Sequence, residues 1–421
     1  MPYVSWFSKP LERSQQSIMK LSDEDHGGAT SHISSCRFRN KLSKFYPPSS
    51  RACNKEFRST VLEKTKLFAI QSGKVTMTSY AHCIWGLSFF LNSPLRLIGP
   101  HITQLASNSP LLRPSSTRPT LVMLRYFVPL VVVHTAAFLA FMPSLFSWTA
   151  LAVCIAGIHV FGQAITMGYH RLLTHRSFAV PRWFEYSLVV LALCCLEDSP
   201  ARWVSTHRKH HVHSDEHEDP HSPLVTFLWG HMGWLFLHNR ELHQWSNYER
   251  YAKDVLQDPF YMWLEKNPTS PLWFYIAQCV LFFAAPLAVG SIWLDWNSAL
   301  YFAAGMVVWG VFVRTVLVWH ITWSVNSLTH LFGYKNHDTD ENSRNNWLVA
   351  LVAAGEGWHN NHHHDPSCCS VQHKWWELDV TYWEVRALKA VGIVKDIVPR
   401  REVRVEEAKK AAKKSAVSKA S

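Results

Sequence analysis

Three short histidine clusters are the residues of this chain whose type and spacing could do chemistry. They read His170-Arg-Leu-Leu-Thr-His175, His207-Arg-Lys-His210-His211 and His359-Asn-Asn-His362-His363. Histidines at positions i, i+3 and i+4 of a helix project from one face, so the second and third clusters can each offer three imidazoles to one point. The i, i+5 spacing of the first cluster indicates a helix end or bend. Because neutral imidazole is the commonest protein metal ligand, the clusters predict a metal site.

One further pair of side chains joins these candidates. Asn326 and His330 are four residues apart at the end of a long apolar run, so they share a helix face. Nine other histidines are interpreted as core or surface residues outside the ligand set: His134, His213, His217, His221, His231, His320, His337, His364 and His373. Imidazole suits iron, zinc, copper and nickel, so the spacing predicts a metal without identifying it.

Four long apolar runs are available to position the clusters, at about 121–142, 146–167, 272–293 and 299–323. Twenty-two helical residues cover about 33 Å, which is enough for a hydrocarbon core of about 30 Å. Tight turns join the runs into two hairpins, and each hairpin returns the chain to its starting side just before a cluster. The sequence therefore predicts an all-α integral membrane protein, with four transmembrane helices in two hairpins and a helical cap that holds a histidine-rich metal site.

Charge predicts the orientation of this membrane protein. The formal net charge is +11, and the basic residues concentrate in the terminal tails. Under the positive-inside rule, the cap, the clusters and both termini lie on the cytoplasmic or equivalent side, although the sequence does not say of which membrane. Basic flanks beside apolar runs favour contact with anionic lipid over a nucleic-acid partner. The nine cysteines contain no CxxC pair, so neither a zinc ribbon nor a disulfide framework is predicted.

Composition divides the chain into four parts. Residues 1–76 are rich in Ser, Lys and Arg and are predicted to lie outside the catalytic fold; a transit peptide, a disordered arm and an over-long predicted start remain alternatives. Residues 77–120 are broken by prolines and form a pre-membrane or interfacial segment. Residues 121–390 are the catalytic domain, in which 224–268 belong to the cap. Residues 391–421 are a basic C-terminal tail.

The order of the motifs resembles a known family. His170–His175, His207–His211 followed by Ser-Asp-Glu-His-Glu-Asp-Pro-His-Ser-Pro, Asn326–His330, and Glu356-Gly-Trp ahead of the third cluster are together similar to the membrane-bound fatty acid desaturases of the stearoyl-CoA (delta-9) type. The resemblance covers roughly residues 121–390. It implies a four-helix membrane stalk beneath a cytosolic cap that holds two irons. The ligands that it implies are His170, His175, His207, His210, His211, His330, His359, His362 and His363, with Asn326 acting through a water.

The resemblance also implies an activity. The expected enzyme is an O2-dependent desaturase that introduces a cis double bond, at the delta-9 position, into a saturated long-chain acyl group carried by CoA or by a lipid. An external donor, cytochrome b5 or a ferredoxin, would supply electrons. Carboxylates commonly orient ligand imidazoles from behind, and the candidates for this role are Glu356, Asp215, Asp219 and Glu197. Candidates for the lining of a bent apolar tunnel are Trp203, Trp229, Trp234 and Trp358.

Three other functions are considered at this point. A related membrane di-iron hydroxylase or sterol-modifying oxidase would use similar histidine boxes. A non-catalytic relative that binds acyl lipid would be expected to lack one of the ligand histidines, and none is missing. A histidine-rich metal transporter, which belongs to another class, would place its ligands at mid-span, whereas these clusters follow the apolar runs. The sequence leaves open the acyl carrier, the chain length and regiochemistry, the electron donor, the organelle and the oligomeric state.

Overall fold

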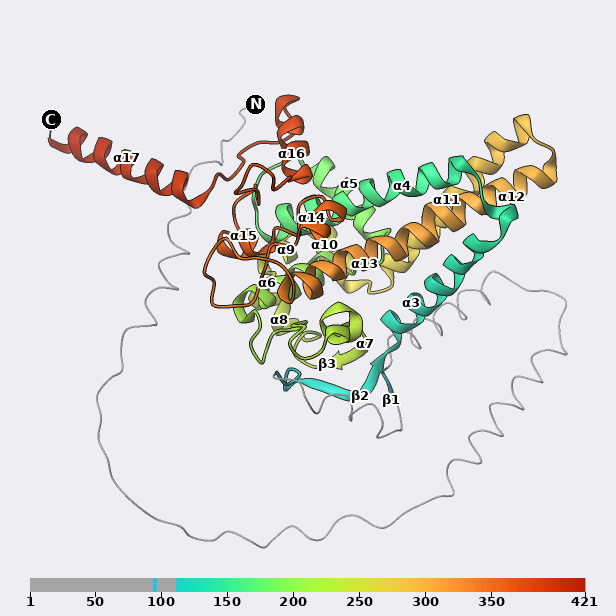
Figure 1. Ribbon diagram of the computed structural model, residues 1–421, viewed down its shortest axis with the longest axis horizontal. Coiled ribbons are helices and arrows are strands. Elements are labelled where there is room, and N and C mark those ends of the chain that lie inside the picture. Colours follow the sequence, from blue (N-terminus) through green and yellow to red (C-terminus); the bar gives the residue numbers. More distant parts are fainter. Residues whose placement is uncertain (1–93, 97–110, 421) are drawn as a thin grey trace, which may run out of the picture. The chain divides into compact units, whose positions relative to one another are not determined.

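The computed structural model describes residues 94–96 and 111–420 (Figure 1). The predictions for residues 1–76, and most of the segment 77–120, lie outside these described residues.

Within the described part of the chain, four helices are long and apolar enough to cross a membrane, as predicted. Each is continuous, and all but the third change their winding along their length. The first joins α3 (Leu124–Ala137) to η4 (Phe138–Phe141), and the second joins α4 (Trp148–Gln163) to η6 (Ala164–Thr174). The third is α11 (Ser270–Trp293), and the fourth joins α12 (Trp296–Val307), η8 (Val308–Val313), α13 (Arg314–Ser327) and η9 (Leu328–His330). The second and fourth helices run further than predicted, so His170, Asn326 and His330 are parts of the long helices themselves.

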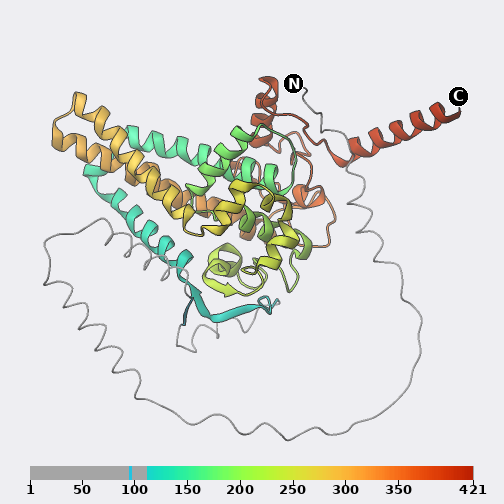
Figure 2. The same cartoon turned by 180° about the vertical axis from the view of Figure 1, so that it is seen from behind.

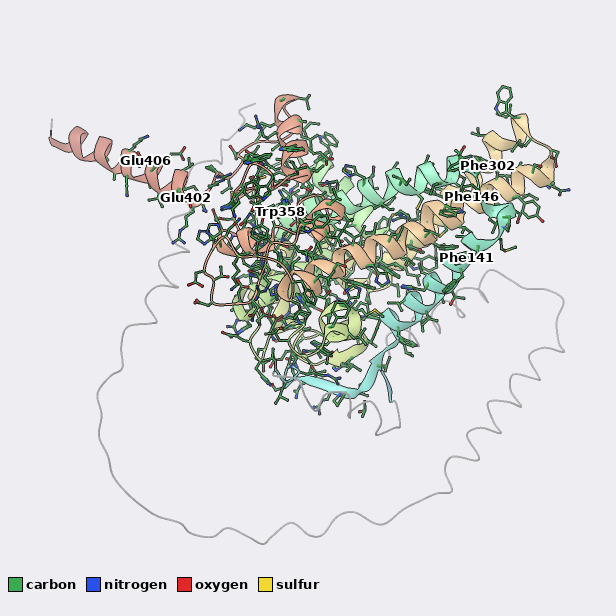
Figure 3. All side chains as sticks on the ribbon, in the orientation of Figure 1. Phe141, Phe146, Phe302, Trp358, Glu402 and Glu406 are labelled. Atoms are coloured by element: carbon green, nitrogen blue, oxygen red, sulfur yellow. The ribbon has the colours of Figure 1, made fainter. Side chains whose placement is uncertain are left out.

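Local chemistry explains the links between these helices. Between the first and second, the short η5 (Pro143–Leu145) leads to Ser147, whose hydroxyl accepts a hydrogen bond from Ala150 N at the start of α4. Between α11 and α12, Asp295 accepts from the backbone amides of Asn297 and Ser298. Side-chain caps of this kind satisfy the free amides of a helix start. At this end of the helices Phe141, Phe146 and Phe302 are labelled in Figure 3, and Phe141 is 81% exposed, as expected of a surface that lipid covers.

Shorter helices form a cap at the other end of the long helices (Figures 1 and 2). The helices between the second and third long helices are α5 (Arg182–Leu193), α6 (Pro200–His213), η7 (Trp229–Gly233), α7 (Trp234–Phe236), α8 (Trp245–Tyr251), α9 (Lys253–Leu256) and α10 (Pro259–Lys266). Those after the fourth are α14 (Trp347–Val352), α15 (His359–His364) and α16 (Val380–Ala390). They are followed by α17 (Arg401–Ala420), whose described side chains are almost all exposed. A buried cluster that includes Tyr169, Leu193, Val204 and Leu264 joins the second long helix to α5, α6 and α10. The cap and the stalk therefore share a core.

A small sheet was not predicted from the sequence. Strands β1 (Pro94–Arg96), β2 (Thr117–Met123) and β3 (Leu237–Asn239) form an antiparallel sheet in that order, with Leu95 opposite Val122 and Thr117 opposite Asn239. Pro119 has no amide hydrogen for a helix, and the flanking Thr and Val residues favour extended backbone. The prediction of an all-α chain is therefore wrong at this point, although the described chain is mostly helical. The first long helix begins at Leu124, after the strand, and not at residue 121.

Candidate metal centre

Nine histidine rings gather into two sets. The first set is His170, His175, His207, His211 and His362, and the second is His210, His330, His359 and His363. Within each set, one ring nitrogen from every member lies within 4.8 Å of the others. These nine residues are the nine histidines predicted as ligands, and the fold brings all of them together from α6, α15 and the ends of the second and fourth long helices.

Each HxxHH cluster is divided between the two sets. On α6, His207 and His211 face the first set and His210 faces the second; on α15, His359 and His363 face the second set and His362 faces the first. At about 100° per residue, position i+4 lies about 40° from position i around the helix axis, whereas position i+3 lies about 60° from position i in the opposite direction. The prediction that each cluster offers three imidazoles to one point is therefore wrong. Two adjacent centres share each helix instead.

The first cluster is positioned by an unusual winding. Residues Ala164–Thr174 form a π-helix, and the amide of His175 donates to the carbonyl of His170 at 3.1 Å. This i to i+5 hydrogen bond brings residues five apart close together on one side, and the ring centroids of His170 and His175 are 4.8 Å apart. The helix ends at Thr174, which confirms the predicted helix end.

The start of α15 is held by a side chain from another segment. The side-chain oxygen Oδ1 of Asn345 accepts hydrogen bonds from the backbone amides of Asn360 (3.1 Å) and Asn361 (3.2 Å). These amides belong to the first turn, where a helix has no internal acceptors. Because Asn345 supplies the acceptor, the helix can begin at His359, directly at the metal sets.

Three carboxylates lie behind three of the rings. His170 Nδ1 is 2.8 Å from Glu356, His210 Nδ1 is 2.9 Å from Asp219, and His330 Nδ1 is 2.8 Å from Asp215. An ionised carboxylate only accepts hydrogen bonds, so each Nδ1 carries the hydrogen and each Nε2 is left with a lone pair. The candidate carboxylates Glu356, Asp215 and Asp219 thus stand where ring-orienting groups would stand.

Glu197 does not take this position. Among the described residues, its carboxyl group accepts a hydrogen bond from the Trp203 side chain and from no ligand imidazole. Conversely, the sequence reading missed Glu341, whose Oε1 lies 3.7 Å from His363 Nδ1. Glu341 stands in a loop without a recognisable motif, so only its distance from the ring identifies it.

Two other residues at the site were not expected there. Arg171, beside His170, is buried and pairs with both Glu356 (2.8 Å) and Asp379 (2.9 Å). Although burial opposes ionisation of Glu356, Arg171 and His170 lower its pKa to about 2. His221, predicted to lie outside the ligand set, is buried against His210 with ring centroids 4.3 Å apart, and its Nδ1 has no hydrogen-bond partner among the described residues. In the sequence, His221 is marked only by its place in the segment that follows the second histidine cluster.

The donor set fits a pair of metal ions. In the first set, Nε2 of His362 lies 3.1 Å from that of His170 and 3.0 Å from that of His211; in the second, Nε2 of His363 lies 3.1 Å from that of His359. A cation bound between two such nitrogens would accept a lone pair from each. Histidine nitrogens bind a metal at about 2.0–2.1 Å, so neighbouring ligands at a right angle are about 3.0 Å apart. Buried Nε2 atoms of His175, His210 and His330 have no hydrogen-bond partner among the described residues, and a metal would satisfy them.

Six of the nine rings are held in the neutral form, which is the form that binds metal. Burial, and then the neighbouring imidazoles, lower the pKa far below the ordinary value for His175, His207, His211, His359, His362 and His363. His210 differs: burial opposes the charge, but Asp219 outweighs it and raises the pKa of the ring.

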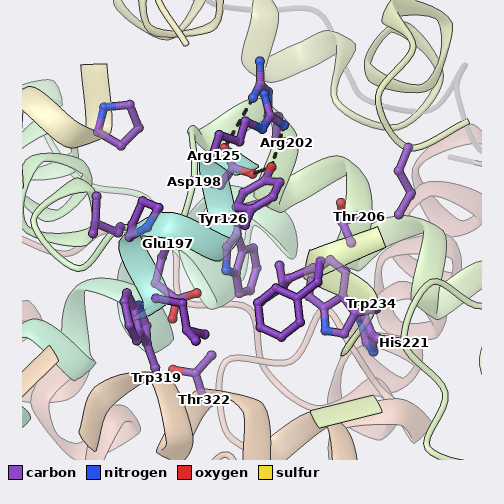
Figure 4. Close-up of a pocket in the computed structure, with 18 of the residues that line it drawn as sticks. Arg125, Tyr126, Glu197, Asp198, Arg202, Thr206, His221, Trp234, Trp319 and Thr322 are labelled. Carbon is purple, nitrogen blue, oxygen red and sulfur yellow. Dashed lines mark hydrogen bonds and ion pairs between the residues drawn. The ribbon is translucent and has the colours of Figure 1, made fainter. Parts of the chain in front are cut away.

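Two cavities meet beside the first set. The first runs between the start of α3, α6 and the fourth long helix, and is lined by Trp203 and Trp234 among others (Figure 4). The second lies between α4 and α13 and reaches Val352 at the end of α14. Both are mainly apolar. The residues that line both are Trp203, His207, Thr322 and Asn326. Of the tryptophans predicted to line a tunnel, Trp203 and Trp234 do so, whereas Trp229 and Trp358 line neither cavity.

Comparison with known proteins agrees with this arrangement. The sequence matches the fatty acid desaturase family over residues 146–392, a span that contains both histidine sets. It is 40% identical over 271 residues to the sn-2 palmitoyl-lipid 9-desaturase of Nostoc sp. (strain 36), covering 63% of this chain and 87% of that protein. It is 40% identical over 265 residues to the sn-1 stearoyl-lipid 9-desaturase of Anabaena variabilis, covering 63% and 89%. It is 36% identical over 258 residues to the acyl-CoA C20 Delta5-desaturase of Anemone leveillei, covering 61% and 76%.

Proposed function

The chain belongs to the fatty acid desaturase family, and on that premise we propose that it introduces a cis double bond at carbon 9 of a saturated acyl chain esterified in a membrane lipid. The observation that carries this proposal is the gathering of nine imidazoles, in two sets, beside the meeting point of two apolar cavities. Two relatives at 40% identity are named lipid 9-desaturases, while the relative named for an acyl-CoA substrate is less similar and is named for another position. These names favour a lipid carrier and the delta-9 position.

The ions that the two sets would hold are proposed to be iron. Removal of hydrogen from an unactivated methylene is beyond acid–base groups, and two bound irons would supply the chemistry of dioxygen activation. Over one turnover, a –CH2–CH2– unit, O2, two electrons and two protons give –CH=CH– and two waters. We propose that an external protein, cytochrome b5 or a ferredoxin, donates the two electrons.

The contribution of the protein chain is to position the imidazoles that would bind the metals. Four of the nine imidazoles are oriented by a carboxylate at Nδ1: His170 by Glu356, His210 by Asp219, His330 by Asp215 and, at longer range, His363 by Glu341. Arg171 holds Glu356 in place. Asn326 stands one helical turn before His330 and lines both cavities, so it is positioned to hold a water between the substrate and the metals.

The two cavities together form the acyl path in this proposal. The carboxyl half of the chain would occupy the first cavity and the methyl half the second, with the reacting carbons between Trp203 and Thr322. The Trp203 indole stacks on His207 with centroids 5.1 Å apart, so the acyl chain passes directly beside a ligand imidazole. Both cavities are mainly apolar along their length, which limits the access of bulk water to the acyl chain.

Topology and domain limits are part of the proposal. The four long helices would form two hairpins, because only short links separate the first from the second and the third from the fourth. The cap and both termini would then lie on the cytoplasmic or equivalent side, as the Lys- and Arg-rich residues after 395 favour. Residues 121–390 would be the desaturase domain, with 1–76 as an extension, 77–120 as a pre-membrane segment and 391–421 as a basic tail.

The test is product analysis in a host that lacks its own desaturase. The full chain is expressed with a palmitate or stearate source, and mass spectrometry locates the new double bond in the membrane lipids. We expect a delta-9 product from the wild type and none from His210→Ala. His213→Ala is the matched control, because His213 is on the same helix but belongs to neither set. A hydroxylated product alone, or strong residual unsaturation in His210→Ala, would overturn the proposal.

A further inference from the structure

Three histidines that were predicted to be core or surface residues outside the ligand set lie in one chain of hydrogen bonds. His134 stands on the first long helix, His320 on the fourth, and His231 on η7 of the cap. His134 Nε2 lies 3.2 Å from His320 Nε2, and His320 Nδ1 lies 3.0 Å from His231 Nε2. Each ring comes from a different element, so only the fold brings the three together.

The chain ends on an oxygen atom at both sides. His134 Nδ1 lies 2.8 Å from the carbonyl oxygen of Leu130, one helical turn earlier. At the other end, His231 Nδ1 lies 2.9 Å from Ser327 Oγ, and Ser327 Oγ lies 2.9 Å from the carbonyl oxygen of Trp323. Every nitrogen of the three rings therefore has a hydrogen-bond partner.

Two protonation states fit this geometry. A carbonyl oxygen only accepts, so His134 Nδ1 carries a hydrogen in both states. If all three rings are neutral, His320 donates to His134, His231 donates to His320, and the Ser327 hydroxyl donates to His231. If one proton is added, every one of these bonds reverses, the Ser327 hydroxyl donates to the Trp323 carbonyl, and both nitrogens of His134 carry hydrogen. The same positions of the heavy atoms suit both states, so the chain can bind and release one proton without moving.

The surroundings favour a cation at the His134 end of the chain. Trp319 stacks on His134, with ring centroids 5.7 Å apart and the ring planes inclined by 27°, and an aromatic face attracts a cation at this distance. Among the described residues, no carboxylate, lysine or arginine forms a hydrogen bond or an ion pair with the three rings. The titratable groups that pack in the same cluster as Trp319 are Tyr275 and Cys279 of α11. Histidines in membrane helices are costly and commonly belong to a proton or ion path.

The serine end of the chain adjoins the candidate metal centre. Ser327 is fully buried, follows Asn326 directly, and stands one helical turn before the ligand His330. Asn326 lines both cavities, whereas the three rings of the chain are not among the residues that line them. A proton that leaves the chain at the hydroxyl of Ser327 therefore leaves beside the place where the reaction needs it.

The proposed reaction consumes two protons in each turnover, while its mainly apolar cavities limit the access of bulk water. We propose that this chain stores one proton and delivers it to the metal centre through the hydroxyl of Ser327. On release, the hydroxyl gives up its proton and takes one from His231, and the two imidazole links each pass one proton along. His134 thereby returns to its neutral form, and one proton has left the chain. The inference rests on the proposed function.

The experiment compares the wild type with Ser327→Ala and His320→Gln, as full-length enzymes in lipid vesicles. A glutamine amide can donate to one neighbouring ring and accept from the other, but it does not pass a proton along. Ser324→Ala is the matched control: Ser324 is on the same helix, its hydroxyl also donates to a carbonyl one turn earlier (His320 O, 2.6 Å), and it forms no hydrogen bond with a ring among the described residues. The kcat, the KM, the metal content and the ratio of rates in H2O and D2O are measured for each.

We expect Ser327→Ala and His320→Gln to lower kcat at least about tenfold, with unchanged KM and metal content. The solvent isotope effect should rise in both, because proton delivery becomes the slow step, and Ser324→Ala should match the wild type. A chain with a structural role alone would leave His320→Gln with the kcat and the isotope effect of the wild type. That result, or an equal loss in Ser324→Ala, overturns the inference. If His320→Gln does not fold, Ser327→Ala decides.

A second measurement does not depend on activity. Titration of the weakly buffered protein between about pH 8 and pH 5 counts the protons that each variant binds. The wild type should bind one proton more per chain than His134→Phe, which keeps an aromatic ring against Trp319 but removes the end that holds the added proton. A histidine that is only packed in the stalk stays neutral, so equal counts would overturn the inference. An inactive wild type would instead refute the proposed function, and the proton count would still test the chain.

Discussion

Replacing Asp219 by asparagine is expected to release one of the two metals and to leave the other in place. Asp219 uses both carboxylate oxygens: each lies within 3.0 Å of His210 Nδ1, Oδ2 accepts from the amide of Asp215 (2.7 Å), and Oδ1 accepts from the amide of His221 (3.0 Å). All of these partners are N–H donors. In the asparagine variant, one of the two oxygen positions becomes an NH2 group, which would point at a backbone amide and at the His210 ring.

The ring can relieve this conflict only by changing its tautomer. If Nδ1 of His210 accepts from the new NH2 group, the ring hydrogen moves to Nε2, which then points an N–H at the metal in place of a lone pair. Loss of a carboxylate behind a ligand imidazole typically costs 10- to 100-fold in metal affinity, or about 1.4–2.7 kcal/mol. Only the second histidine set should lose affinity, because Asp219 contacts His210 and no member of the first set.

The assay is a chelator titration of the purified full-length protein, with bound metal counted per chain. Asp219→Asn should lose one metal at a chelator concentration about 10- to 100-fold lower than the wild type does, and should lose the second at the wild-type concentration. Asp340→Asn is the matched control, because Asp340 is an exposed cap residue that belongs to neither metal set. Equal weakening of both metals, or wild-type behaviour, would refute the reasoning about the His210 tautomer.

Three further predictions follow from the same contacts. Arg171→Met leaves Glu356 and Asp379 buried without their cation, so it should cost about 3–5 kcal/mol of stability, seen as a lower unfolding temperature in detergent; an unchanged temperature would contradict the pairing. Acid should destabilise the protein as the pH falls below about 6.5, because His207 and His362 bind protons in the unfolded chain but stay neutral in the fold, where their pKa values are lowered. Urea midpoints between pH 7.5 and 5.5 measure this stability, and a flat profile would argue against neutral rings. Gly162 lines the second cavity, and an added Cβ would meet no atom within 4 Å. Gly162→Leu should therefore fill part of this cavity and shift the product from C18 towards C16 chains, while the metal content stays constant. An unchanged chain-length profile would show that the methyl end of the acyl chain lies elsewhere.

The sequence predicted those parts of the molecule that depend on periodic patterns. Apolar runs of spanning length identify the four long helices. The spacing within the three histidine clusters and the Asn326–His330 pair identifies nine imidazoles that the fold brings together. Glu356, Asp215 and Asp219 were also found, because they stand within a few residues of histidine clusters. In each case the signal is local, and hydropathy or spacing along one segment is sufficient to read it.

Features that depend on contacts between distant segments were not predicted. The division of each HxxHH cluster between two sets could be predicted only if the position of the other HxxHH helix were known. The 100° between positions i+3 and i+4 separates their rings, but the sequence does not say which set lies on which side. The sheet joins residues 117–123 to 237–239 across more than a hundred residues. Glu341 and Arg171 act through partners that are remote in sequence, and Glu197 was assigned to the wrong neighbour for the same reason.

The shared helices have a mechanical consequence for the two centres. Because His207 and His211 face one set while His210 faces the other, α6 fixes the separation of the two sets through its own backbone, and α15 repeats this constraint with His362 against His359 and His363. Neither helix can turn to improve one set without moving its ligands out of the other. The separation is therefore held by two short rigid helices, and the long helices add His170, His175 and His330 from the stalk. A site built in this way keeps its geometry while an acyl chain enters beside His207.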